Sequence, residues 1–340
     1  MSFHSAARLA TRLIALTTVP LLLAACVISP KLDDGDRKKI ERKTFVVTGA
    51  SSGFGRGTAL ALARQHANVV LAARRVELLE EVAGQVRMHG GAALVVETDV
   101  SDAQQVRRLT EAAVQRFGHV DAWINNAGVG AIGRFEDIPV EDHARVIDIN
   151  LKGVVYGSHA AMKLFRAQGY GVLVNTASVD SVVPLAYQAA YAATKAAVLS
   201  LTHSLNQESR LAGQKQVKAA AVLPWAADTP WWPHAANYSG HQPRNAGMDD
   251  PQMVADAIAW IAVHPREQLA VGWKARGSVA SHRVFPEWTE RLAANIQYDD
   301  LRKGAPAAPG SGSIHMPMAE GREVDGGVAE RMKAEDDARP

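Results

Sequence analysis

The sequence predicts an α/β fold in which a doubly wound parallel sheet carries helices on both faces. Short runs rich in Val, Ile and Ala alternate with longer segments of helical periodicity from Lys43 to about Gly272. The short runs are apolar throughout, which is typical of parallel strands buried on both faces, and such strands need helical crossovers. Because no change in composition interrupts the alternation, we expect a single domain over residues 43–275, with extensions at both ends.

The individual elements follow from the same alternation. Strands are expected where a run is apolar and β-branched, at residues 44–48, 68–73, 92–97, 120–125, 172–176 and 217–223. Helices are expected between strands where apolar residues recur at helical spacing, as at residues 58–65, 76–88 and 103–117.

Composition excludes several classes of protein. Of the 340 residues, 47% are hydrophobic and 21% are charged, which is ordinary for a soluble domain with a sizeable core. The formal net charge of +2 gives no reason to expect a nucleic-acid partner. The single cysteine, Cys26, excludes an intramolecular disulfide framework and a cysteine zinc site. The 12 histidines show no metal-binding spacing, so we expect no metal.

The N-terminus differs in composition from the central domain. Two arginines precede an apolar stretch at residues 13–25, which ends in Leu-Ala-Ala followed by Cys26 and so resembles a bacterial lipoprotein signal. The stretch is short for a membrane-spanning helix, which needs about 20 apolar residues, and its pattern is that of a secretory signal. We expect a signal or anchor over residues 1–26, a solvated tether over 27–42, and membrane association. The alternatives are an uncleaved anchor, or a start assigned too far upstream on a cytoplasmic protein.

The C-terminus also differs from the central domain. Beyond Arg302 the chain is rich in Pro, Gly and Ser and ends in mixed charges. Such composition is typical of a flexible tail, so residues 276–340 are expected to form a partly flexible extension.

A glycine-rich segment lies where the first strand should turn into the first helix. Glycines at that turn let the backbone approach a pyrophosphate and leave the helix N-terminus free to bind it, as in a Rossmann fold. The alternative is that they are ordinary turn residues. The candidate cofactor-binding residues in this segment are Thr48, Gly49, Ser51, Ser52, Gly53, Phe54 and Gly55.

The end of the second strand indicates which dinucleotide binds. An acidic residue there would accept hydrogen bonds from the adenosine ribose of NAD, whereas a basic residue would neutralise the 2′-phosphate of NADP. Here Ala73 is followed by Arg74 and Arg75. Cations at a helix N-terminus oppose the helix dipole, so a bound anion would explain them better than a solvated helix start. The sequence therefore favours NADP, with NAD the less favoured cofactor.

Tyr191 and Lys195 form the candidate proton-transfer pair. On a helix, positions i and i+4 share a face, so both side chains can point into one pocket. An ammonium near the phenol would lower the tyrosine pKa from about 10 and make it a usable acid or base. This spacing alone also occurs by chance on amphipathic helices.

Other polar residues end neighbouring strands. Ser178 follows the strand at 172–176 and is placed to hold a carbonyl oxygen of a substrate. Asn125 ends the strand at 120–125 and leads into Ala127 and Gly128, at the edge where open α/β sheets bind ligands. Asn150 falls within a helical segment, where it is a poor helix former.

Together these motifs resemble the short-chain dehydrogenase/reductase family. TGASSGFG, NNAG, the Asn of INLKG, Ser178 and YAATK occur in the family's order over residues 43–275. The resemblance implies a catalytic centre of Ser178, Tyr191 and Lys195, with Asn150 holding a water that relays protons to Lys195. It also implies that Lys195 contacts the nicotinamide ribose and Asp99 the adenine region. Asn125, Ala127 and Gly128 are likewise implied near the cofactor, although Asp99 and Asn125 also suit capping roles.

Two features depart from the family pattern. Pro224 is followed by Trp225 where the family has glycine, so the backbone of this loop is expected to follow a different path from the family's. Thr229 is a candidate contact to the nicotinamide amide. Trp225, Trp231 and Trp232 then cluster in one segment, which indicates either core packing or a lid that forms an apolar wall for a bulky substrate.

The sequence thus predicts an NADP-dependent enzyme that interconverts a carbonyl and an alcohol. Its substrate is expected to be an apolar small molecule, and the protein is expected to form a homo-oligomer. The alternative is a catalytically silent NAD(P)-binding sensor or scaffold of the same fold. Retention of Ser178, Tyr191, Lys195 and Asn150 together argues against that alternative. A dehydratase or epimerase would need signatures that the sequence does not contain.

Overall fold

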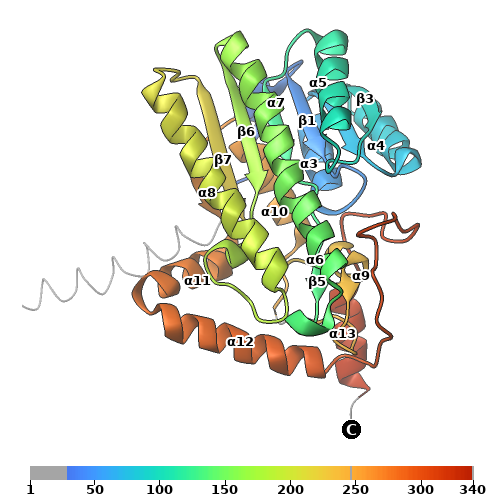
Figure 1. Ribbon diagram of the computed structural model, residues 1–340. Coiled ribbons are helices and arrows are strands. Elements are labelled where there is room, and N and C mark those ends of the chain that lie inside the picture. Colours follow the sequence, from blue (N-terminus) through green and yellow to red (C-terminus); the bar gives the residue numbers. More distant parts are fainter. Residues whose placement is uncertain (1–28, 246, 339–340) are drawn as a thin grey trace, which may run out of the picture.

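A parallel sheet of seven strands forms the centre of the computed structural model, which describes residues 29–245 and 247–338 (Figure 1). The strand order is β3-β2-β1-β4-β6-β7-β9, so the chain builds outward in both directions from the paired central strands β1 and β4. This is a doubly wound sheet, and the predicted fold class is confirmed. The strands are β1 (Thr44–Thr48), β2 (Asn68–Ala73), β3 (Ala92–Glu97), β4 (Ala122–Asn125), β6 (Gly171–Thr176), β7 (Val217–Leu223) and β9 (Gln268–Ala270).

Helices cover both faces of the sheet and enclose two main apolar cores (Figure 1). Along β1, Phe45 and Val47 point into one core and Val46 into the other, as the period of a strand requires. The first face carries α3 (Gly53–Ala63), α4 (Val76–Met88) and α10 (Pro251–Ile261). The second carries α5 (Ala103–Phe117), α7 (Gly153–Gln168) and α8 (Ala189–Leu211).

Some elements were not expected from the sequence. Strand β9 extends the sheet at its edge, and β5 (Ala131–Ile132) pairs with β8 (Ala236–Asn237) in a separate small sheet. Helix α3 begins at Gly53, earlier than the predicted helix at 58–65, because the glycine-rich segment itself forms the first turn. Two short helices flank the site, α6 (Val140–Ile147) and α9 (Trp231–His234).

The N-terminal residues that the structure describes do not form a solvated tether. Helix α2 (Arg37–Ile40) buries Ile40 completely, and the Asp36 carboxylate lies 2.6 Å from His264 Nε2. The predicted tether therefore joins the domain before Lys43. The predicted signal or anchor at residues 1–26 lies outside the described residues, and no helix within 29–245 or 247–338 is long and apolar enough to span a membrane.

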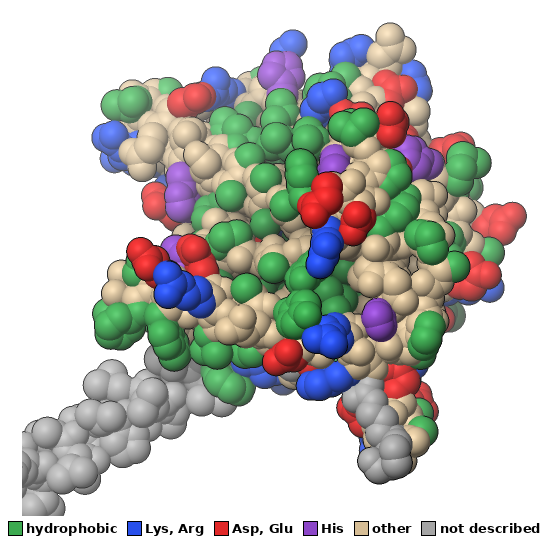
Figure 2. Space-filling view, turned by 60° about the horizontal axis from the view of Figure 1, so that its bottom comes forward, with side chains coloured by type: hydrophobic (Ala, Val, Ile, Leu, Met, Phe, Trp, Pro, Cys, Tyr) green, Lys and Arg blue, Asp and Glu red, His purple; other side chains and the backbone are tan. Residues whose placement is uncertain are grey.

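The C-terminal third of the chain closes one end of the sheet. Helices α11 (Gly272–Val284) and α12 (Pro286–Arg302) lie across the end from which β6 and β7 run into their loops (Figure 1). Residues 303–327 then return along the domain, and α13 (Val328–Asp337) packs beside α9. Hydrophobic and charged side chains mix on the face that these elements form (Figure 2). The segment predicted as a flexible tail thus lies against the domain.

Candidate active site

A cavity of about 370 Å³ opens at the carboxyl ends of the parallel strands. This is the edge at which the strand order reverses, where doubly wound sheets bind their ligands. Loops from six strands and helix α8 meet there. The lining includes the glycine segment, Arg74 and Arg75 after β2, Thr98 to Val100 after β3, Asn126 to Val129 after β4, Thr176 to Asp180 after β6, Pro224 to Ala227 after β7, and Tyr191 and Lys195.

The glycine segment is shaped by close backbone approach. Gly49 has φ of +67°, and a Cβ there would lie 2.8 Å from the Ala127 Cα. A Cβ on Gly55 would lie 2.2 Å from the carbonyl oxygen of Gly49. The Thr48 hydroxyl accepts hydrogen bonds from the backbone N–H groups of Asn126 and Ala127, which ties this segment to the loop after β4. Thr48 and Gly55 therefore shape the wall, whereas the cavity is lined by Gly49, Ser51, Ser52, Gly53 and Phe54.

Arg74 and Arg75 both reach the cavity, at the end nearest β2. The Arg75 guanidinium donates to the hydroxyl groups of Ser51 and Ser52, at 3.1 Å and 2.7 Å. Burial lowers the pKa of Arg74 from its ordinary value; the Asp99 carboxylate opposes that effect and the Arg145 charge adds to it. Burial also lowers the pKa of Arg75, and the Arg74 charge adds to that effect. A cluster of partly desolvated guanidinium groups is a favourable site for an anion.

Asp99 lies on the cavity wall and does not cap a helix. Its carboxylate accepts hydrogen bonds from the Ser101 hydroxyl at 2.6 Å and from Arg145 Nη2 at 2.7 Å. The cap of α5 is Asp102, whose side chain accepts from Gln104 and Gln105. Asp99 is therefore positioned at the site, as the sequence analysis expected, with its charge already paired.

Asn125 is placed differently from the prediction. Its side chain points into the core, where it accepts from Trp123 Nε1 at 2.7 Å and donates to Asn175 Oδ1 at 2.9 Å, and it does not line the cavity. The residue that lines the cavity is Asn126, which the sequence analysis did not select. Side chains of consecutive residues at a strand end point to opposite sides, so the motif Asn-Asn offers one residue to the core and one to the site.

Asn150 stands in a π-helical turn, Asp148–Lys152, between α6 and α7. Such turns widen the helix and frequently occur at functional sites. The Asn150 amide is fully buried and grips the backbone of Val129, accepting from its N–H and donating to its carbonyl, both at 2.8 Å. A Cβ on Gly128 would lie 3.5 Å from both Asn150 Oδ1 and Lys195 Nζ, so these groups converge on one point of the loop.

Ser178, Tyr191 and Lys195 meet at the same cavity. Lys195 Nζ donates to the carbonyl oxygen of Thr176 at 2.7 Å and lies 5.5 Å from the Tyr191 ring centre. The Ser178 hydroxyl accepts from the backbone N–H of Asp180 at 3.1 Å. Helix α8 supplies the tyrosine and lysine from one face, and the loop after β6 supplies the serine opposite them.

The pKa values of these groups depart from the expectation. Burial lowers the pKa of Lys195 to about 8, and the nearby Asp180 carboxylate opposes that effect. Burial raises the pKa of Tyr191, Asp180 raises it further, and a hydrogen bond with Ser178 opposes them. The expected lowering of the Tyr191 pKa is therefore not observed in the protein alone, because desolvation disfavours the phenolate.

Asp180 is the site residue that the sequence analysis missed. It is 5% exposed, lines the cavity two residues after Ser178, and burial raises the pKa of its carboxyl to about 7, with Lys195 opposing. The only signal in the sequence was that Asp180 lies just beyond the end of a buried strand. Many aspartates in ordinary turns occupy such a position, so it does not single out a site residue.

The three tryptophans play different roles. Trp231 lies on the cavity wall, with its ring edge against Tyr191 at 5.2 Å between centres. Trp232 is 5% exposed and donates a hydrogen bond from Nε1 to the carbonyl oxygen of Ala227, so most of its side chain is packed in the core. Trp225 donates to the carbonyl oxygen of Gly247 and also lines the cavity. Thr229, 5% exposed, lies on the same wall.

The far end of the cavity combines apolar side chains with one polar pair. Leu185, Ala293 and Ile296 contribute the apolar surface, the last two from α12. Asn245 Nδ2 donates to Gln297 Oε1 at 3.1 Å, and both residues line the cavity. Among the residues that the structure describes, no cluster of three or more His, Cys, Asp or Glu could hold a metal ion.

The sheet is doubly wound, glycines shape the turn before the N-terminus of α3, and a Tyr–Lys pair lies at the same cavity. These features define the class of α/β enzymes that act on a ligand at the carboxyl edge of the sheet. Residues 43–237 match the family described as short chain dehydrogenase. The chain therefore belongs to the short chain dehydrogenase family and is an oxidoreductase.

Individual relatives agree with this assignment. An uncharacterized oxidoreductase of Bacillus subtilis, YxnA, is 35% identical over 275 residues, which cover 80% of this chain and 77% of that protein. Among solved structures, an alcohol dehydrogenase from the archaeon Thermococcus sibiricus, complexed with 5-hydroxy-NADP, is 30% identical with a TM-score of 0.60, covering 68% of this chain and 97% of that one. A 3-ketoacyl-(acyl-carrier-protein) reductase from Brucella melitensis, complexed with NADH, is 30% identical with a TM-score of 0.59, covering 68% and 98%.

Proposed function

We propose that the protein is an NADP-dependent oxidoreductase that interconverts a carbonyl and an alcohol, with Tyr191 as general acid and base. The observation that carries this proposal is that one cavity joins Ser178, Tyr191 and Lys195 to the glycine segment and to Arg74. The solved relatives bound to 5-hydroxy-NADP and to NADH support a nicotinamide coenzyme.

The residues present fit such a coenzyme. A Cβ on Gly49 or Gly55 would lie only 2.8 Å or 2.2 Å from neighbouring backbone atoms, so no side chain fits at either position. No side chain at these positions therefore blocks a pyrophosphate that approaches the N-terminus of α3. Arg74 and Arg75 would hold the adenosine end, and Thr229 and Lys195 the nicotinamide end. When bound, the coenzyme would supply or accept the hydride at the substrate carbon.

The protein's own groups then manage the proton. In reduction, the Tyr191 hydroxyl donates its proton to the carbonyl oxygen; in oxidation, the phenolate takes the proton from the alcohol. The Ser178 hydroxyl donates a hydrogen bond to the same oxygen and orients it. Lys195 is held by the Thr176 carbonyl, and its charge favours the phenolate against the effect of burial. Asn150 fixes the loop at Val129 that faces Lys195.

We propose a bulky, apolar substrate. Trp225, Trp231, Leu185 and Ile296 supply large apolar surfaces around the reacting groups. The Asn245–Gln297 pair supplies a polar group at the far end, suited to a hydroxyl or carbonyl on the substrate. A panel of aliphatic and aromatic ketones and alcohols, followed by NADPH absorbance, tests the reaction. Coenzyme binding without turnover of any of them would favour the alternative, a silent binding protein.

The coenzyme preference is tested by Arg74→Asp. The carboxylate would repel a 2′-phosphate and accept from a ribose hydroxyl, so the ratio of kcat/KM for NADPH over NADH should fall at least about tenfold, the effect of losing one charged hydrogen bond. Steady-state kinetics with both coenzymes measure the ratio. Arg87→Asp, at an exposed position outside the cavity lining, is the control. An unchanged ratio would mean that the phosphate is bound elsewhere, by Arg75 or Arg56.

We also propose that Cys26 is lipidated and that the protein is attached to a membrane. The support is the apolar stretch at residues 13–25 and the Leu-Ala-Ala that precedes the cysteine. Cys26→Ser should then abolish acylation and move the protein from the membrane to the soluble fraction or leave its signal uncleaved, while the domain from Lys43 stays folded. Intact mass of the purified protein checks this. An unmodified full-length chain in the wild type would contradict lipidation and favour a cytoplasmic enzyme.

A further inference from the structure

The C-terminal arm, residues 311–327, lines the cavity at the end where Arg74 and Arg75 lie. Ser313, Pro317 and Met318 form part of the lining, together with Arg74 and Arg75. The arm has no regular secondary structure before α13, and its backbone contacts both arginines. Its contacts with them are made almost entirely by main-chain carbonyl groups.

Arg74 is occupied by one end of the arm. Its Nη2 donates to the carbonyl oxygen of Ser313 at 2.7 Å, and its Nη1 donates to those of His315 at 3.2 Å and Ile314 at 3.4 Å. Arg145 Nε adds a hydrogen bond of 3.0 Å to the Ile314 carbonyl. Carbonyl oxygens carry partial negative charge, so here they fill the place that an anion would take between the guanidinium groups.

Arg75 is occupied by the next stretch of the arm. Its Nη1 donates to the carbonyl oxygens of Glu320 at 3.0 Å, Gly321 at 3.1 Å and Met318 at 3.3 Å. Further along, the Glu323 carbonyl accepts from the backbone N–H of Gly53 at 2.9 Å. The arginine contacts use donors that a 2′-phosphate would need, whereas the Gly53 contact lies where either dinucleotide would approach.

The part of the arm that contacts Arg74 is anchored by one apolar side chain, that of Ile314. Ile314 is fully buried and packs with Ala131, Ile138 and Val146. Its neighbour His315 adds a contact of 2.8 Å to the Asp142 carboxylate. By contrast Met316, two residues beyond Ile314, is 75% exposed.

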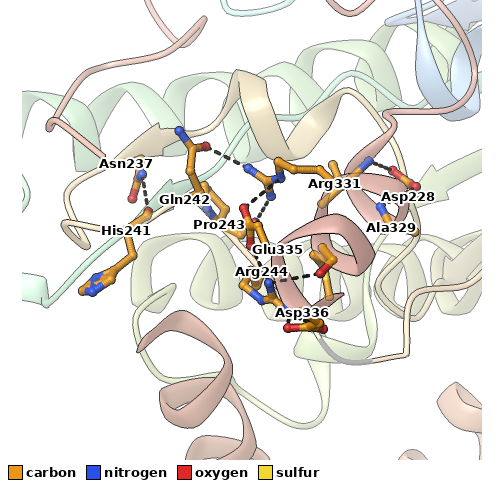
Figure 3. Close-up of polar contacts among 12 residues, drawn as sticks. Asp228, Asn237, His241, Gln242, Pro243, Arg244, Ala329, Arg331, Glu335 and Asp336 are labelled. Carbon is orange, nitrogen blue, oxygen red and sulfur yellow. Dashed lines mark hydrogen bonds and ion pairs between the residues drawn. The ribbon is translucent and has the colours of Figure 1, made fainter. Parts of the chain in front are cut away.

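The far end of the arm is tied down independently, by the contacts of α13 (Figure 3). The Asp228 carboxylate accepts from the backbone N–H groups of Val328 and Ala329, both at 2.8 Å, and so caps the helix from outside. Arg244, 3% exposed, pairs with Asp336 at 2.7 Å and also with Glu335 (Figure 3). The arm can therefore lift from Arg74 and Arg75 while α13 keeps it attached.

We propose that the C-terminal arm determines coenzyme selectivity, by holding Arg74 and Arg75 with its carbonyl groups so that a 2′-phosphate binds only after displacing it. This inference rests on the proposed use of a nicotinamide coenzyme at this cavity. NAD lacks the phosphate, so it has no need of the two guanidinium groups. NADP binds only the molecules in which the arm is open. Its apparent affinity is therefore the intrinsic affinity multiplied by the open fraction, which is small while the arm is closed. Loosening the arm should therefore favour NADP selectively.

The test is Ile314→Ala in the full chain, with Met316→Ala as the matched control on the same arm. Dissociation constants for NADPH and NADH are measured by fluorescence titration. The Ile314 variant should bind NADPH about tenfold more tightly, through the larger open fraction, while its affinity for NADH changes less than about twofold. The control should match the wild type for both. Ile314→Val, which removes less of the side chain, should give a smaller change in the same direction and serves if the alanine variant does not fold.

Hydrogen exchange supplies a second readout that does not depend on turnover. In the wild type, NADPH should speed amide exchange over residues 313–321, and NADH should not, because only the phosphate competes with the carbonyl groups of these residues for Arg74 and Arg75. Weaker binding of NADPH by the Ile314 variants, or slower exchange over 313–321 with NADPH, would overturn the proposal and make the arm a clamp over bound coenzyme. Equal changes for both coenzymes would also overturn it. Wild-type protein that binds neither coenzyme would instead overturn the proposed function itself.

Discussion

Tyr191→Phe should reduce turnover at least about 100-fold, the lower end of what a positioned acid or base contributes. The phenyl ring keeps the packing against Trp231, whose ring centre is 5.2 Å away, so the wall of the cavity is retained. Only the hydroxyl that exchanges a proton with the substrate oxygen is lost. Binding of NADPH should stay within about twofold of the wild type, because the phenol is used in the chemical step rather than in holding the coenzyme.

The measurement is kcat with the best substrate from the panel, alongside the dissociation constant for NADPH. Tyr170→Phe is the matched control, since Tyr170 precedes β6 at the opposite end of that strand from the cavity. It should leave both quantities unchanged. If Tyr191→Phe kept more than a few per cent of wild-type turnover, another group would have to transfer the proton, and the assignment of Tyr191 would fail.

The fold and the location of the site could be predicted from the sequence because both follow from local patterns. Continuous apolar runs mark buried parallel strands, and the carboxyl ends of such strands meet at one edge. Residues that follow separate strands, such as Gly49, Ser178 and Thr229, therefore come together although they are far apart along the chain. Strand β9 was missed because its three residues, Gln268–Ala270, are too few to form a pattern.

The placement of particular side chains was less predictable. Asn125 and Asn126 are chemically identical in the sequence, and only the strand's direction decides that the first enters the core. The raised pKa of Asp180 comes from its burial beside Tyr191 and Lys195. No pattern in the residues next to Asp180 in the sequence predicts that burial. The raised pKa of Tyr191 has the same origin, since the extent of desolvation depends on the assembled walls of the cavity.

The C-terminal arm was predicted as a flexible tail because its composition gives no sign of a partner. Its hydrogen bonds to Arg74 and Arg75 come from main-chain carbonyl groups, which every residue carries, so no side-chain pattern encodes them. The residues joined are also as many as 246 positions apart in the chain. Ile314, Met316 and Met318 are apolar, but the sequence alone does not show that Ile314 is fully buried while Met316 is exposed.

Asp180→Asn should change how the stability of the protein depends on pH. The folded pKa of Asp180 is about 7, above the ordinary value of 3.8, because burial disfavours the carboxylate. Between those values the folded state binds the proton more tightly than the unfolded state, so this group lowers stability as pH rises toward 7. The asparagine has no proton to lose. The variant should therefore gain about 2–3 kcal/mol relative to wild type on going from pH 5 to pH 8.

Lys195 reinforces the same trend. The Asp180 carboxylate opposes the lowering of the Lys195 pKa, so its removal should lower that pKa below about 8. A lysine with a lowered folded pKa destabilises the protein most at low pH, where it must be charged, and this cost disappears as pH rises. Denaturant unfolding at pH 5 and pH 8 measures the difference for wild type, Asp180→Asn and the exposed control Asp137→Asn. The control should show no such change, and a variant that lost stability relative to wild type between pH 5 and pH 8 would contradict a carboxyl group kept neutral by burial.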